Sequence, residues 1–162
     1  MGMTGTYVAT DESTIQKILA KQLSAIDFLY DKNNELPTPN LNIDKSWDAM
    51  HFTLTGTMQE VIENEPLSKV VLGGKPLDPE ADEDSEHFYF TISDVKEANT
   101  ALQSISTEDF KAKWDFAAQR KNNVYPMINV NDADNFLEYF VKIKEFYDQA
   151  AQQSKCIIFF IA

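Results

Sequence analysis

The sequence predicts an α+β fold: a small mixed β-sheet that includes both termini, covered by about five or more α-helices. Strand-like runs lie near the two ends of the chain, at Tyr7–Ala9 and at Lys155–Ala162. The second run is apolar without alternation, which is typical of an inner strand. A third run, His87–Ile92, is aromatic and β-branched. Apolar residues at helical spacing occupy several segments between these strands, and we expect the 162 residues to form a single domain, 1–162.

The first part of the chain predicts a long helix followed by a loop. Thr10–Ser13 supply N-cap candidates and acidic residues for a first turn. Apolar residues then recur at helical spacing as far as Leu29, so the helix should run to about Tyr30. Residues 32–42 contain two prolines and four asparagines, a composition typical of a loop.

Two further helices are predicted from the residues at their ends. Asp44 is a good N-cap residue, helical spacing follows it, and Gly56 can end the helix. Pro66–Gly74 predicts a short helix with proline in its first turn and Gly73 just beyond its last turn. The next segment, Leu77–Glu86, has six acidic residues among ten, which favours a solvated loop over a cation site.

The second half of the chain is mostly helical in pattern. A helix follows the third strand, and Ser106–Asp109 form a capping box for a short helix through about Phe116. Asn122–Pro126 predicts a turn. Asn131 or Asp132 should cap a last long helix, whose apolar face carries Phe136, Phe140, Ile143 and Tyr147.

Composition excludes several classes of partner. The formal net charge is −12, from 26 acidic and 14 basic residues, which argues against nucleic acid and against anionic membrane surfaces. No apolar run approaches the roughly 20 residues that a membrane-spanning helix needs. The only cysteine is Cys156, within an apolar run, so we expect a small buried hydrophobic residue and a cytoplasmic protein without disulfides.

Standard motifs for phosphate binding, zinc binding and nucleophilic catalysis are absent, so we expect no cofactor and no metal. One group of polar residues stands out within the predicted helix from 44 to 56. Its spacings of four, three and four place most of its members on one helical face, with a tryptophan beside it that can stack on the histidine. We take this candidate cleft to consist of Asp44, Trp47, Asp48, His51 and Thr55.

Two interpretations of this group remain open. An aspartate that holds a histidine is the orienting half of a general-base arrangement. The same residues can also be a structural histidine, satisfied by Asp48 or by a cap and packed on Trp47. No serine or cysteine nucleophile can be assigned, so the catalytic residues stay unknown.

At this helix the chain resembles the YfbM-like family, a bacterial group of unknown function. The resemblance extends in order along nearly the whole chain. It is carried by the Met1-Gly-Met start, the segments Asp44–Gly56 and Pro66–Gly74, the Val124–Pro126 turn and the apolar C-terminal strand. It implies an α+β fold and brings no established activity or catalytic residues.

Two functions from different classes follow. The first is a binding or interaction protein whose acidic surface docks a basic protein partner or a small polar ligand. The alternative is a small enzyme that uses an acid–base cleft around the helix from Asp44 to Thr55. A deep pocket lined by the face of that helix would favour the enzyme, and a flat acidic patch would favour the partner-binding protein.

Overall fold

The computed structural model describes residues 2–30, 32–33, 35–80, 87–126 and 133–162. Its centre is an antiparallel sheet with the strand order β2-β1-β5-β4-β3. The α+β class is confirmed, with strands from both end regions of the chain in the sheet. The pairings between described strands are antiparallel, so the sheet is not mixed. The strands are β1 (Gly5–Thr10), β2 (Asn40–Asn42), β3 (Lys75–Pro76), β4 (His87–Phe90) and β5 (Cys156–Ile161).

Strand β5 is the central strand of this sheet, which confirms the inner position that its uninterrupted apolar run predicts. It pairs with β1 on one side and with β4 on the other, so that Phe159 lies opposite both Tyr7 and Phe88. All six of its residues are buried. Because successive side chains of a strand point to opposite faces, β5 contributes to the packing on both sides of the sheet.

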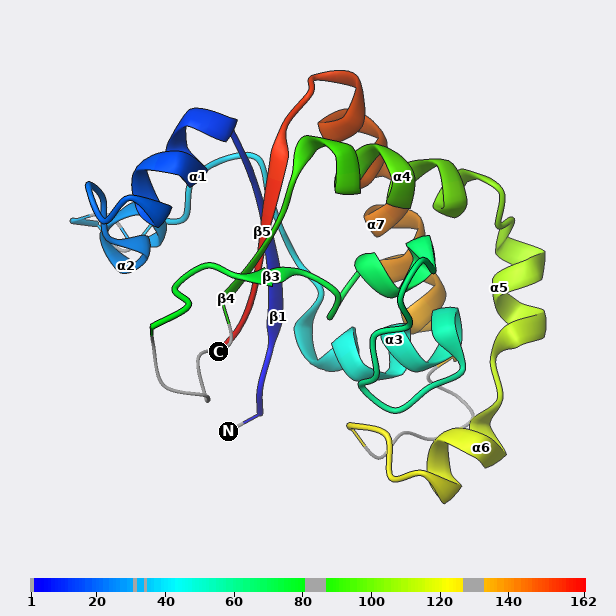
Figure 1. Ribbon diagram of the computed structural model, residues 1–162. Coiled ribbons are helices and arrows are strands. Elements are labelled where there is room, and N and C mark those ends of the chain that lie inside the picture. The colour runs from blue at the N-terminus through cyan, green and yellow to red at the C-terminus, as the bar shows by residue number, and fades with distance from the viewer. Residues whose placement is uncertain (1, 31, 34, 81–86, 127–132) are drawn as a thin grey trace.

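Helices cover both faces of the sheet (Figure 1). On one face, α1 and α2 pack over the even-numbered residues of β5, such as Ile158 and Phe160. On the other face, a larger core joins Ile157 and Phe159 to α3, α4, α5 and α7. The helices are α1 (Glu12–Leu19), α2 (Ala25–Leu29), η1 (Asp44–Ser46), α3 (Trp47–Thr55), η2 (Pro66–Lys69), α4 (Ile92–Gln103), α5 (Thr107–Lys113), α6 (Phe116–Lys121) and α7 (Ala133–Gln152).

Some helix boundaries agree with the sequence predictions and others do not. The capping box at Ser106 is present, with its hydroxyl accepting from the backbone N–H of Asp109. The single helix predicted to Tyr30 is wrong, because α1 ends at Leu19 and α2 begins after a new cap at Ser24. Lys21, with a φ of 59°, lies between the two helices. This break contains no glycine or proline from which it could have been predicted. The helix predicted through Phe116 likewise ends at Lys113, and α6 follows.

Two glycines serve different purposes. Gly56 ends α3 with φ of 74°, as predicted, and its N–H donates to the carbonyl of Phe52. Gly73 was expected to end a helix, but η2 ends earlier, at Lys69, and Gly73 does not have a positive φ. Instead, a Cβ at Gly73 would overlap the carbonyl oxygen of Ser68 and lie 2.9 Å from Lys69 Cα. Glycine is therefore required there by close packing of the backbone.

Two other predictions can be compared with the structure. Cys156 is 2% exposed, and burial raises the pKa of its thiol to about 11, so it packs as a small apolar side chain. In the part of the chain that the structure describes, no helix is both long and apolar enough to cross a membrane. The predicted cap of the last helix at residue 131 or 132, and residues 81–86 of the acidic loop, lie outside the described residues.

Candidate functional site

The five residues of the predicted cleft do not share one environment. Asp44 begins η1, where it is exposed and has φ of 50°, and its N–H donates to Oδ1 of Asn42 at 2.6 Å. Trp47, Asp48 and His51 lie on α3 and are 5%, 1% and 0% exposed. Trp47, Asp48 and His51 therefore lie in the interior, whereas Asp44 faces solvent.

Asp48 is held by the backbone of a distant segment. Its Oδ2 accepts a hydrogen bond from the N–H of Tyr125 at 2.9 Å. Its Oδ1 is buried and has no hydrogen-bond partner. Burying a carboxylate costs free energy unless its oxygens are hydrogen-bonded. The bond from the Tyr125 N–H to Oδ2 is the main interaction that offsets this cost for Asp48.

His51 is satisfied by a backbone carbonyl and not by Asp48. Its Nε2 lies 2.8 Å from the carbonyl oxygen of Glu60, so in the neutral ring Nε2 carries the proton and donates. Its Nδ1 is buried without a partner. Burial lowers the pKa of His51, while the Glu60 carbonyl and the charge of Asp48 oppose that shift. The predicted hydrogen bond between Asp48 and His51 is wrong, because each is bonded to a backbone group elsewhere.

Trp47 and Thr55 also differ from expectation. The indole of Trp47 lies against the ring of Tyr125, with centroids 5.7 Å apart, and its Nε1 donates to the carbonyl of Met3 at 3.1 Å. The predicted stacking on His51 is thus replaced by a contact with Tyr125. Thr55 is half-buried, and its hydroxyl donates to the carbonyl of His51 at 2.8 Å.

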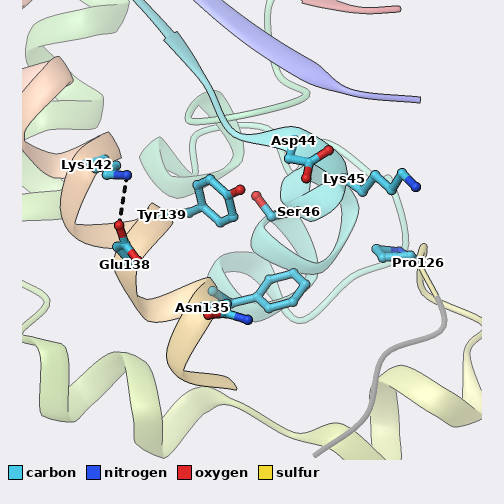
Figure 2. A pocket seen from close by; sticks show the side chains of 9 residues that line it. Asp44, Lys45, Ser46, Pro126, Asn135, Glu138, Tyr139 and Lys142 are labelled. Carbon is cyan, nitrogen blue, oxygen red and sulfur yellow. Dashed lines mark ion pairs between the residues drawn. The ribbon is translucent and has the colours of Figure 1, made fainter. Parts of the chain in front are cut away.

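A hollow lies near the start of α3, between η1 and the first turns of α7 (Figure 2). Its volume is about 300 Å³. Of the predicted cleft residues, Asp44 lines it, whereas Trp47, Asp48, His51 and Thr55 do not. The side chains around the hollow are mostly polar and come from three segments distant in sequence: Asp44, Lys45, Ser46, Pro126, Asn135, Phe136, Glu138, Tyr139 and Lys142.

Several polar groups around the hollow already have partners. Lys142 is paired with Glu138 at 2.9 Å, one turn away on α7, and its Nζ lies 5.9 Å from the centroid of the Tyr139 ring. The hydroxyl of Ser46 donates to the carbonyl of Ile43 at 2.6 Å. Burial and the nearby carboxylate of Asp44 raise the pKa of Tyr139, which keeps its hydroxyl protonated.

Tyr139, Glu138 and Lys142 were not predicted as site residues. In the sequence, the last helix is recognised by its apolar face of Phe136, Phe140, Ile143 and Tyr147, which does not include these three residues. The available signal was the pairing of Glu138 with Lys142 at a spacing of four, which marks an exposed helical face. That signal does not reveal that the face lies opposite η1.

Metal ligands do not gather in this region. Within residues 2–80, 87–126 and 133–162, apart from 31 and 34, no three His, Cys, Asp or Glu side chains are placed to hold a metal ion. The side chains that line the hollow offer hydrogen bonding, charge and aromatic contact.

Comparisons with known proteins agree with this architecture. The chain is 37% identical over 137 residues to Protein YfbM of Escherichia coli strain K12, covering 82% of this chain and 78% of that protein. The fold matches a crystal structure described as a protein of unknown function, YfbM from Escherichia coli, with a TM-score of 0.72. That superposition has 22% identity and covers 98% of this chain and 99% of the other. A family model described as "Domain of unknown function (DUF1877)" matches residues 1–160, and the chain therefore belongs to this family.

Proposed function

We propose that this protein is a binding or interaction protein, and that the hollow between η1 and α7 is its ligand site. The observation that carries the proposal is the hollow itself: about 300 Å³, enough for a small polar molecule or one side chain of a partner. Its wall offers two carboxylates, hydroxyl groups and two aromatic rings, which are carried mainly by α7 and the η1 turn.

The acid–base alternative has less support. A general base must come within hydrogen-bond reach of the proton that it removes. Asp48 and His51 are 1% and 0% exposed, and neither lines the hollow. Their hydrogen bonds to Tyr125 and to Glu60 are of a kind that holds a fold together. Binding at the hollow requires neither residue to reach a ligand.

The charge of the chain bears on the partner. A formal charge of −12 attracts cationic molecules and raises their rate of association. A basic protein partner or a small polar ligand, in the cytoplasm, fits this composition. Association at low salt should be faster than at physiological ionic strength, where charges are screened beyond about 8 Å.

The test is a nuclear magnetic resonance titration of the full chain with small polar probes of both signs. We would use an alkylamine, a guanidine, a carboxylate, inorganic phosphate and a neutral amide. Support requires that one class shifts the backbone amides of residues 44–46 and 135–142 in a saturable way. Shifts confined to other surfaces, or none with any probe, would reject the hollow as a ligand site.

A variant that fills the hollow gives the control for this titration. Asn135→Trp places a large side chain at an exposed position on the rim, so the fold should be kept. Ser93→Trp makes a comparable change at an exposed position in the first turn of α4. The saturable shifts should vanish in the first variant and persist in the second. Their persistence in Asn135→Trp would place the ligand elsewhere.

A further inference from the structure

We infer that the hollow between η1 and α7 takes a cationic group rich in N–H donors, and that a guanidinium group fits it best. This inference rests on the proposed function of the hollow as a ligand site and adds the chemical class of its ligand. It is carried by the hydrogen-bonding state of the side chains that line the hollow.

Two of the three η1 residues that line the hollow, Asp44 and Ser46, present acceptors to it. Ser46 uses its hydroxyl proton on the carbonyl of Ile43, at 2.6 Å, so its oxygen can only accept from a ligand. Asp44 adds a carboxylate, and no lysine, arginine or histidine among the described residues forms an ion pair with it. Two neighbouring acceptors, one of them charged, call for a ligand with several donors.

The lysines of the wall do not cancel this preference. Lys142 is neutralised by Glu138 at 2.9 Å. Lys45 extends away from Tyr139 and Ser46 (Figure 2), and its ammonium lies over the N-terminal segment, where a Cβ on Gly2 would be 2.9 Å from it. Among the described residues that line the hollow, the charged side chains without an ion pair are therefore Asp44 and Lys45, and Lys45 is directed away from Tyr139 and Ser46.

Aromatic surface favours a planar cation. Phe136 and Tyr139 both line the hollow, and the hydroxyl end of Tyr139 faces Ser46 in Figure 2. Lys142 already places its ammonium 5.9 Å from the centroid of the Tyr139 ring, so this ring attracts a cation within the fold. A guanidinium group can stack on an aromatic ring while its edge donates to a carboxylate, which a compact ammonium group does less well.

Two sources can supply this chemistry: the arginine side chain of a basic protein partner, or a free guanidino compound. The probes that separate the chemical classes are Nα-acetyl-arginine amide, Nα-acetyl-lysine amide and Nα-acetyl-citrulline amide, of which the last has the shape of arginine without the charge. A short glycine- and serine-flanked peptide with one arginine separates the sources. Tighter binding of the peptide than of the arginine amide indicates a protein partner, and equal binding indicates a small molecule.

The experiment measures the affinity of each probe for the full chain through the amide shifts of residues 44–46 and 135–142. The arginine probe should bind more tightly than the lysine probe, and the citrulline probe most weakly. Asp44→Asn should weaken the arginine probe roughly fivefold, as expected for the loss of a partly exposed charge pair, and leave the citrulline probe unchanged. Asparagine tolerates the positive φ of this position, so the fold is kept.

Asp27→Asn is the matched control, since it removes the same charge at an exposed position on α2, among the helices on the opposite face of the sheet. It should leave the affinity for the arginine probe unchanged. Equal binding of citrulline and arginine, or tighter binding of a carboxylate probe, would overturn the cationic inference while the hollow remained a ligand site. An absence of saturable binding by every probe would overturn both proposals.

Discussion

The side-chain oxygen Oδ2 of Asp48 accepts a hydrogen bond from the backbone N–H of Tyr125, 77 residues further along the chain, at 2.9 Å. The same tyrosine packs its ring against Trp47, and its hydroxyl accepts a hydrogen bond from the N–H of Met3 at 3.0 Å. The start of α3 thereby joins the segment after α6 to the N-terminal residues. Polar residues that suggested catalysis in the sequence connect three parts of the fold.

Replacing Asp48 should test this connection. Asp48→Ala leaves the N–H of Tyr125 without its acceptor in a part-buried place, so the free energy of unfolding should fall by about 2–3 kcal/mol. Urea denaturation measures the change. Asp44→Asn, on the same segment but exposed, should change stability far less, because asparagine tolerates the positive φ of this position. Equal stability of Asp48→Ala and the wild type would show that the buried carboxylate of Asp48 makes no net contribution to stability.

Stability should decline in mild acid because of the histidines. Burial lowers the pKa of His51 below its usual 6.5, so the unfolded chain binds a proton at a pH where the folded chain does not. This contribution to stability is complete above pH 6.5 and is lost as the pH falls toward the lowered pKa. Burial lowers the pKa of His87 in the same direction.

Denaturation curves at several pH values between about 5 and 7 measure this slope, above the range where most carboxylates titrate. His51→Gln keeps an N–H for the Glu60 carbonyl and removes the titration, so the slope should become shallower. His87→Gln isolates the other histidine. A slope that His51→Gln leaves unchanged would mean that His51 takes no part in it.

Gly73→Ala should be more harmful than Gly56→Ala. A Cβ at Gly73 overlaps the backbone of Ser68, which cannot move aside as a flexible side chain could. A Cβ at Gly56 meets no atom within 4 Å, so its cost is the positive φ alone, about 1–2 kcal/mol. Thermal unfolding of both variants compares them. A smaller loss for Gly73→Ala than for Gly56→Ala would contradict the close approach.

Deleting residues 157–162 should prevent folding. The deletion removes most of β5, whose large apolar side chains are worth about 1.5–3 kcal/mol each, against a typical total stability of about 5–15 kcal/mol. It also separates β1 from β4 in the sheet. Circular dichroism during heating should show no cooperative transition. Ile158→Val, expected to cost about 0.5–1.5 kcal/mol, is the conservative control that should still melt cooperatively.

The parts of the fold that the sequence predicts are those with local signals. The capping box at Ser106 and the uninterrupted apolar run of β5 each identify an element from adjacent residues. β2 and β3 have three and two residues, too few for any periodicity, and they exist because neighbouring strands offer hydrogen bonds. The local sequence pattern of a strand also does not reveal whether it runs parallel or antiparallel to its neighbours. A mixed sheet was therefore expected, and the sheet is antiparallel.

The candidate site was predicted only in part for a related reason. The spacing of Asp48 and His51 is real, but their partners, Tyr125 and Glu60, are backbone groups that no side-chain pattern identifies. The hollow depends on α7 lying opposite η1, which tertiary packing decides. Asp44 was predicted because it lies four residues before Asp48, on the same helical face, whereas Tyr139 belongs to no polar group that the sequence singles out.

The place of β5 between β1 and β4 has a consequence for the order of folding. The fully buried strand β1 pairs with β5 from Gly5 opposite Ile161 to Thr10 opposite Cys156, so its main partner is synthesised after nearly all the rest of the described chain. Until then β1 can pair only with the short β2. Contacts so far apart in sequence slow the search for the native state. During synthesis on the ribosome, the helices can form before the sheet is complete. β1 remains accessible to chaperones and prone to aggregation until β5 has left the ribosome.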